Sequence, residues 1–171
     1  TIFARDVDTG MANWVYQMTP FDEWDFDGIN EMILADIKVK GKDTKALVHF
    51  DRNGFAYTMD RTNGALLVAE KYDPKVNWAT HVDMKTGRPV ETADSDYSKK
   101  TQLIVPAAFG GHNWHPMAFN PQTGLVYIPA MQPMGIYALS EEFKATGKFT
   151  RRDMFWNPGI DWNTYTDTIY A

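Results

Sequence analysis

The chain has 171 residues, enough for one ordinary domain, with 17 basic and 22 acidic side chains and a formal net charge of −5. This balance argues against a nucleic-acid partner, and no apolar run approaches the roughly 20 residues that a membrane-spanning helix needs. Cysteine is absent, which excludes disulfides and thiolate metal sites within the chain. The sequence opens at Thr1 without a leader and stops at Ala171 on a strand-like segment, so we expect a piece of a longer protein.

Short strands joined by tight turns are predicted along most of the chain. Aromatic residues make up 14% of the sequence, and they suit the half-buried surface of a sheet. Turn signals in which Thr or Asn precedes Gly recur at Gly10, Gly64, Gly87, Gly124 and, more weakly, Gly147. The candidate strands are residues 14–17, 32–35, 46–49, 55–58, 66–69 and 125–128. No window sustains helical periodicity over three turns, and residues 141–148 are the only candidate for a short helix, with a loop as the alternative.

The spacing of the turns favours an all-β propeller. The first four turn glycines are separated by 54, 23 and 37 residues, which indicates units of a few dozen residues with several hairpins each. Because a propeller blade takes roughly 40 to 50 residues, the chain holds about four blades' worth. We expect one partial propeller domain over residues 1–171, with irregular connections between blades at residues 72–104 and 132–171.

Residues 22–28 read Asp-Glu-Trp-Asp-Phe-Asp-Gly, a dense group of carboxylates interrupted by two aromatics. In an extended backbone, successive side chains point to opposite faces. Trp24 and Phe26 are then predicted to be buried on one side, with Glu23, Asp25 and Asp27 lined up on the other. Like charges this close repel, so either water solvates them or a cation lies among them. An acidic surface loop anchored by two aromatics is the alternative.

Residues 4–14 fit the pattern A-x-D-x-x-T-G-x-x-x-W. Gly10 makes the turn, and Trp14 is a large flat side chain that can pack between neighbouring sheets. The pattern resembles the tryptophan-docking motif of quinoprotein alcohol dehydrogenases, although non-enzymatic propellers have similar motifs.

Three further segments make the resemblance more specific. Residues 19–28, 51–64 and 110–117 are similar, in this order, to active-site segments of the methanol and ethanol dehydrogenases that use pyrroloquinoline quinone (PQQ). The resemblance covers nearly all of residues 1–130, and no roles are assigned beyond Ala130. It implies an eight-bladed quinoprotein propeller of which this chain is an internal or C-terminal fragment. It also implies oxidation of a small primary alcohol to the aldehyde, electron transfer to a cytochrome c, and a periplasmic location.

Two carboxylates carry the chemistry that the resemblance implies. Asp25 matches the general base, which takes the hydroxyl proton as hydride leaves the alcohol carbon, and it also lies at the PQQ-bound metal. Asp27 matches an Asp that supplies an extra carboxylate to the metal in the lanthanide-dependent methanol dehydrogenase branch, with Ca²⁺ as the alternative ion. A trivalent hard ion favours this additional anionic oxygen. The alternatives are a turn or N-cap carboxylate for Asp25 and a solvent-facing side chain for Asp27.

Three more residues match cofactor-binding positions of the family. Arg52 matches the basic residue that hydrogen-bonds PQQ near its reactive carbonyl, where a guanidinium stabilises developing charge. Asn113 and Trp114 match positions that contact the carboxylates and rim of PQQ. The alternatives are an Arg52 that pairs with its neighbour Asp51 and a Trp114 that is an ordinary blade anchor.

Part of the family's site is absent from this sequence. The family's metal-binding Glu and Asn, the Trp that stacks on PQQ and a disulfide of adjacent cysteines all precede motifs of this kind, and Phe21 stands where the family commonly has His. The remaining blades or a homodimer partner are therefore expected to complete the site. A non-enzymatic propeller that serves as a binding scaffold is the alternative function, because it explains the docked Trp and the turns.

Overall fold

Antiparallel strands are the main regular secondary structure of the computed structural model, which describes residues 1–148 and the backbone of residues 169–170. One short helix, α1 (Glu141–Thr146), accompanies them. The strands are β1 (Ile2–Arg5), β2 (Ala12–Tyr16), β3 (Ile33–Val39), β4 (Lys42–Phe50), β5 (Phe55–Asp60), β6 (Leu66–Lys71), β7 (Ala79–Asp83), β8 (Arg88–Glu91), β9 (Gln102–Ile104), β10 (Ala118–Asn120), β11 (Leu125–Tyr127), β12 (Ala130–Met131), β13 (Gly135–Tyr137) and β14 (Ile169–Tyr170). The all-β prediction is confirmed, and each of the six predicted strands overlaps an observed one.

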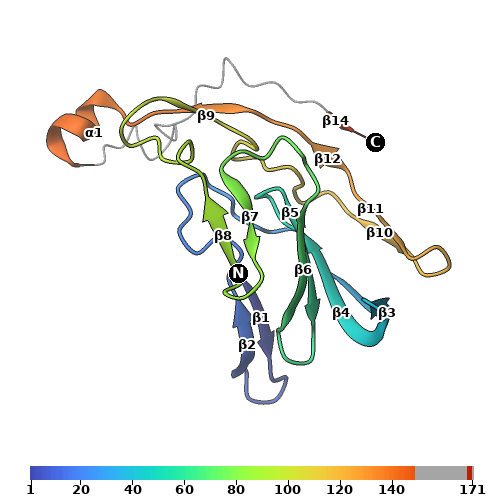
Figure 1. The fold of residues 1–171 in the computed structure, drawn as a ribbon. Helices are drawn as coiled ribbons and strands as arrows, with labels where there is room; N and C mark the ends of the chain where they lie inside the picture. Colours follow the sequence, from blue (N-terminus) through green and yellow to red (C-terminus); the bar gives the residue numbers. More distant parts are fainter. Residues whose placement is uncertain (149–168, 171) are drawn as a thin grey trace.

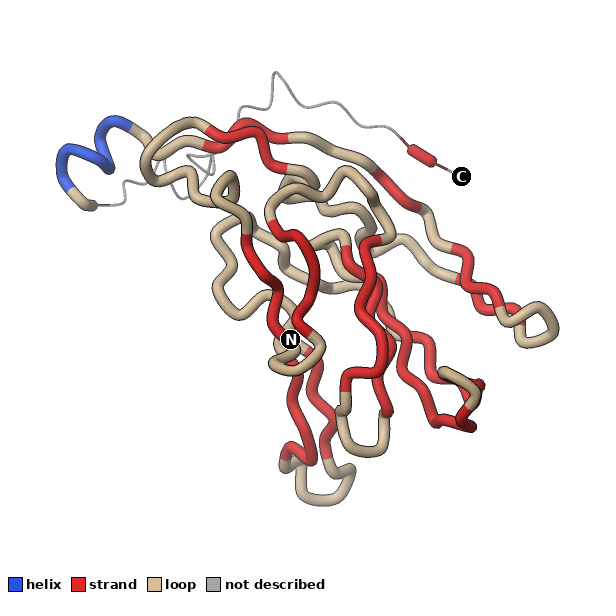
Figure 2. The backbone as a smooth tube through the Cα atoms, in the orientation of Figure 1, coloured by secondary structure: helices blue, strands red, loops and turns tan. Residues whose placement is uncertain are grey.

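The sheets have the form of propeller blades (Figure 1). Strands β3, β4, β5 and β6 make a four-stranded antiparallel meander, which is the form of one blade. Two-stranded sheets pair β1 with β2, β7 with β8, β10 with β11, β9 with β13 and β12 with β14. The hairpins spread outward from a region of longer loops (Figure 2). The residues predicted to form the site all lie outside the strands and the helix.

Four of the predicted turns share one geometry. In each, the amide of the turn glycine donates to the carbonyl oxygen of an Asp or Asn four residues earlier, and the glycine has a φ near +70°, which an L side chain rarely adopts. The pairs are Asp6–Gly10, Asp60–Gly64, Asp83–Gly87 and Asn120–Gly124. The weaker signal at Gly147 was wrong as a hairpin prediction, because this glycine caps the C-terminus of α1.

Trp14 connects two sheets, as its sequence motif predicts. Its indole Nε1 donates to the carbonyl oxygen of Arg61 (3.0 Å), in the turn that joins β5 to β6. The ring lies directly on Gly64, where an added Cβ would come within 2.8 Å of the indole. The glycine of one blade therefore supplies the flat surface on which the tryptophan of the preceding hairpin packs.

The expectation of irregular connections at residues 72–104 and 132–171 was wrong in part. Residues 72–104 contain the β7–β8 hairpin and β9, while β13 and α1 fall within residues 132–148. Short strands with a proline or charged residues, such as β8, carry little hydrophobic alternation, which is why the pattern does not reveal them. Residues 149–168 and 171 lie outside the described part. Among the described helices, none is long and apolar enough to cross a membrane.

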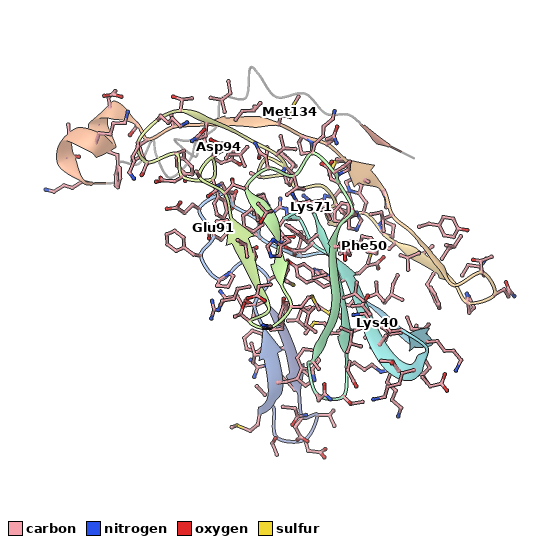
Figure 3. The ribbon with its side chains drawn as sticks, in the orientation of Figure 1. Lys40, Phe50, Lys71, Glu91, Asp94 and Met134 are labelled. Atoms are coloured by element: carbon pink, nitrogen blue, oxygen red, sulfur yellow. The ribbon has the colours of Figure 1, made fainter. Side chains whose placement is uncertain are left out.

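The hydrophobic core lies beneath the loops that form the candidate site. Trp24, Phe55, Tyr57 and Trp78 are each fully buried there. Phe50 and Lys71, labelled in Figure 3, are the last residues of β4 and β6. They lie at the same end of the four-stranded sheet, since Phe50 pairs with Ala56 and Lys71 with Phe55. The turn from β4 to β5 leaves the sheet at this end and enters the candidate site.

Candidate functional site

Two aromatic side chains hold the acidic loop of residues 22–28 against the core. The centroid of the Trp24 ring lies 5.7 Å from that of Phe26 and 4.8 Å from that of Trp78, and the Trp24 indole donates to the carbonyl oxygen of Ser95 (3.1 Å). Both aromatics are buried, whereas Glu23, Asp25 and Asp27 are exposed. The predicted separation of carboxylates from aromatics is therefore confirmed.

The extended backbone predicted for this loop was wrong. None of residues 22–28 belongs to a strand, and Asp25 has a φ of +68°, in the left-handed region. The Asp22 carboxylate accepts a hydrogen bond from the Trp24 amide (3.0 Å), which bends the chain before Asp25. Aspartate tolerates a positive φ better than most residues do, so the loop presents Asp25 to solvent while both neighbouring aromatics reach the core.

Arg52 connects the β4–β5 turn to the acidic loop. Its Nη1 donates to the carbonyl oxygen of Asp27 (3.0 Å), and its Nε donates to that of Phe109 (3.5 Å). The alternative partner, Asp51, forms no ion pair with Arg52; its carboxylate contacts His49 instead. The guanidinium therefore joins the backbone of two segments that are distant in sequence.

The loop that contains Asn113 packs directly on this turn. Gly110 has a φ of +78°, and an added Cβ there would come within 2.6 Å of the Arg52 Cα atom. The Gly111 amide donates to the carbonyl oxygen of Arg52 (3.0 Å). Two adjacent glycines let the two backbones approach this closely, and no larger residue fits at Gly110 without displacing the turn.

The Phe109 carbonyl oxygen connects Arg52 with Asn113. It accepts from Arg52 and from the Asn113 side-chain amide (2.8 Å), while the Asn113 side-chain oxygen accepts from the Trp114 amide (2.8 Å). Asn113 is buried, whereas Trp114 is 68% exposed with its ring stacked on His115. The structure thus connects four predicted site residues through hydrogen bonds, namely Asp27, Arg52, Asn113 and Trp114.

Asp25 lies next to this network, and the charges of Asp27 and Arg52 affect the pKa of its carboxyl group. Partial burial of the carboxyl group, followed by the nearby charge of Asp27, raises the pKa of Asp25 above its ordinary value, and the Arg52 guanidinium opposes the rise. No hydrogen bond in the described structure reaches the side-chain oxygens of Asp25 or Asp27. Both carboxylates therefore have free lone pairs on the exposed side of the loop.

A pocket of about 420 Å³ opens beside the acidic loop. Asp27, Gly28 and Asp51 are among the residues that line it. Asp25 is not among the residues that line this pocket, so the structure brings Asp27 but not Asp25 into it.

Comparisons with known proteins identify a family model and several similar sequences. Residues 1–75 match the family described as the glucose/ethanol/alcohol dehydrogenase β-propeller domain that uses PQQ. The chain is 58% identical over 139 residues to the lanthanide-dependent methanol dehydrogenase of Methylorubrum extorquens, a match that covers 75% of this chain and 23% of the relative. The chain is therefore similar in sequence to quinoprotein alcohol dehydrogenases.

Solved structures support the same assignment of the propeller. A europium-containing methanol dehydrogenase superposes with a TM-score of 0.77 at 48% identity, over 81% of this chain and 24% of its own. The quinohemoprotein alcohol dehydrogenase of Comamonas testosteroni gives a TM-score of 0.77 at 46% identity, over 82% and 21%. The chain thus spans about a quarter of the length of the quinoprotein dehydrogenases it matches.

The donor set suits a hard cation next to an anionic cofactor, as quinoproteins require. Carboxylate oxygens are the ligands that lanthanides and Ca²⁺ prefer, and Asp25 and Asp27 both have free oxygens here. Among the described residues none accepts a hydrogen bond from Arg52 Nη2, which is therefore available to PQQ near its reactive carbonyl. Among residues 1–148, however, no three His, Cys, Asp or Glu side chains form a metal-binding group.

Several functional contacts were missed from sequence alone. The Phe109 carbonyl oxygen is a backbone acceptor, which no side-chain pattern reveals. The pair Gly110–Gly111 was a usable signal, because adjacent glycines often mark a close backbone approach. Asp51 and His49 were not assigned roles, although a carboxylate directly before Arg52 in a turn was visible in the sequence.

Proposed function

We propose that this chain forms part of the active site of a PQQ-dependent dehydrogenase that oxidises a small primary alcohol, of the methanol or ethanol class, to the aldehyde. One observation carries the proposal: the free carboxylates of Asp25 and Asp27 lie beside Arg52, which donates to the Asp27 carbonyl oxygen. A non-enzymatic propeller has no need for this group of charges, and the relatives described above are named as alcohol dehydrogenases.

Asp25 is the proposed general base. Hydride leaves the carbon of an alcohol only as the hydroxyl oxygen loses its proton, so a carboxylate must lie within hydrogen-bond reach of that oxygen. The raised pKa of Asp25 brings its basicity closer to neutral pH, which favours proton abstraction. The left-handed backbone at Asp25 and the buried aromatics on both sides hold this carboxylate outward, which leaves it accessible to an alcohol.

Arg52, Asn113 and Trp114 are the proposed contacts to PQQ. PQQ, when bound with its cation, supplies the electrophilic quinone carbonyl that accepts the hydride. Arg52 Nη2 offers a fixed positive charge beside that acceptor. Trp114 exposes an indole face and an N–H donor. Asn113 connects with Arg52 through the Phe109 carbonyl oxygen, and its side-chain oxygen accepts from the Trp114 amide. Its amide nitrogen retains a second hydrogen for a cofactor carboxylate.

Asp25 and Asp27 are the proposed metal ligands from this chain, and the metal is a lanthanide ion, with Ca²⁺ as the alternative. When no cation is present, two ionised carboxylates close together repel each other, and the charge of Asp27 accordingly raises the pKa of Asp25. A trivalent ion offsets this repulsion more strongly than a divalent ion does.

Partners and location follow from the same proposal. The remaining blades, or a second copy of the chain, would cover apolar side chains that are at least half exposed here, among them Phe3, Val15 and Leu34. Electrons would pass to a cytochrome c, and the protein would work in the periplasm.

The test is alcohol-dependent reduction of an artificial electron acceptor by the full-length protein, reconstituted with PQQ and either La³⁺ or Ca²⁺. We expect turnover with La³⁺, and we expect Asp27→Ala to abolish it because the trivalent ion loses a carboxylate. Unchanged La³⁺-dependent turnover in Asp27→Ala would contradict the metal assignment. Absence of both a quinone absorption band and turnover in the unaltered protein would favour the binding-scaffold function.

A further inference from the structure

A buried pair of side chains lies directly behind the proposed metal ligand Asp27. His49 ends the buried part of β4, and Asp51 begins the turn that carries Arg52. Each is only 1% exposed, and His49 Nε2 lies 3.2 Å from the Asp51 carboxylate. Burying two ionisable groups is costly unless they are paired, so this pair calls for an explanation beyond packing.

The hydrogen bonds of His49 fix the charge of the pair. Nδ1 lies 3.0 Å from the carbonyl oxygen of Glu31, and a carbonyl oxygen can only accept, so Nδ1 carries a hydrogen. The contact between Nε2 and Asp51 requires another hydrogen, on either Nε2 or the carboxyl group. An imidazolium with a carboxylate, or a neutral imidazole with a carboxylic acid, has no net charge in either case. The pair therefore adds a rigid polar contact beside Asp27 without adding a further negative charge.

Asp51 and Arg52 together hold the peptide between Asp27 and Gly28. The Asp51 Oδ1 atom occupies the place that a side chain at Gly28 would take, and its Cγ atom lies 3.4 Å from that position. Arg52 donates to the carbonyl oxygen of Asp27 (3.0 Å). One turn thus contacts the Asp27–Gly28 peptide at both residues, in the wall of the pocket that Asp27 lines.

Other contacts make Asp51 rigid. Its carbonyl oxygen accepts from the Tyr72 hydroxyl group (2.6 Å), and its amide donates to the carbonyl oxygen of Phe55 (3.0 Å). Its second carboxylate oxygen accepts from the Asn53 amide (3.4 Å). Because these partners hold Asp51 in one position relative to the core, Asp51 in turn restricts the position of Gly28, which it contacts.

We propose that the His49–Asp51 pair is the positioning element for Asp27 and thereby sets the coordination of a hard trivalent cation. This inference rests on the proposed function, because Asp27 matters only if it binds the metal. In this role Asp51 acts through its contact with Gly28, the residue that follows Asp27. Partners that orient a ligand in this way typically contribute about 10- to 100-fold to metal affinity.

The test uses Eu³⁺ as the probe, titrated into the full-length protein. Luminescence lifetimes in H₂O and D₂O count the water molecules on the ion, which activity does not report. We expect Asp51→Ala to weaken Eu³⁺ binding about tenfold and to admit at least one additional water, because Asp27 is no longer held in place. Asp51→Asn, which keeps the volume and one acceptor oxygen, should lose less.

A matched control separates positioning from general stability. Asp73 is also buried, and it accepts from the side chain of Gln132, outside the proposed site. Asp73→Ala should leave Eu³⁺ affinity and water count unchanged. If Asp51→Ala folds poorly, Gly28→Ala tests the same contact from the other side, since its new methyl group overlaps the Asp51 carboxylate; it should also add a water.

Each result has a defined meaning. An Asp51→Ala protein with the affinity and water count of the unaltered protein would overturn the inference while leaving the metal site intact. Equal losses in Asp51→Ala and Asp73→Ala would also overturn it, since the effect would then be one of stability. Failure of the unaltered protein to bind Eu³⁺ would instead remove the proposed metal site, and the inference with it.

Discussion

Substitution of Asp25 separates its backbone role from its chemical role. At a φ of +68°, alanine costs about 1 to 2 kcal/mol because its Cβ crowds the following carbonyl oxygen, whereas glycine avoids that strain and asparagine tolerates it. All three substitutions remove the base. We therefore expect Asp25→Asn, Asp25→Gly and Asp25→Ala to lose about 10² to 10⁴ in kcat, while only Asp25→Ala unfolds at clearly lower denaturant concentration.

The assay pairs turnover of the reconstituted full-length protein with denaturant unfolding of the metal-free protein. Because the folded pKa of Asp25 is raised, the folded state holds the proton more tightly than the unfolded state does. Stability of the unaltered protein should therefore fall as the pH rises from the ordinary aspartate value through the folded value, and Asp25→Asn should remove this loss. An Asp25→Asn protein with full turnover would refute the general base, and an Asp25→Ala protein as stable as Asp25→Asn would refute the backbone argument.

Three further predictions test the rest of the account. In the metal-free protein, an NMR titration should find the pKa of Asp25 above the ordinary aspartate value, because partial burial and the charge of Asp27 disfavour the ionised form; a pKa at or below that value would contradict the argument. Trp14→Phe should cost about 1 kcal/mol in unfolding free energy through the lost hydrogen bond to Arg61, and Trp14→Ala should cost more; equal stabilities in denaturant would contradict the docking role. Gly110→Ala should lower both stability and alcohol turnover by displacing Arg52, whereas Gly124→Ala, with a similar φ but open space, should lower stability only slightly; equal losses would contradict the close approach.

Local patterns predicted much of the fold because each strand and turn carries its own signal. The Thr-Gly and Asn-Gly turns predicted hairpins because glycine adopts the left-handed φ of Gly10, Gly64 and their equivalents without steric cost. The strand β8 was missed because its four residues show no clear alternation of buried and exposed side chains. Pairing such as β9 with β13 joins segments more than thirty residues apart, which local periodicity does not encode.

The candidate site was predictable in its residue types but not in its geometry. The alternation of carboxylates with Trp24 and Phe26 predicted which side chains face solvent, and burial confirmed it. The positive φ of Asp25 was not predictable, because it depends on a turn made by the Asp22 side chain and on the packing of Trp24 against Trp78. Backbone acceptors such as the Phe109 carbonyl oxygen, which depend on the fold alone, were likewise out of reach.

The most direct test of the central claim is a structure of the full-length protein with PQQ and a lanthanide ion bound. The account predicts carboxylate oxygens of Asp25 and Asp27 at about 2.3–2.6 Å from one cation, with the Arg52 guanidinium against the cofactor. A cation coordinated elsewhere, with Asp27 turned to solvent and Arg52 away from the cofactor, would contradict it.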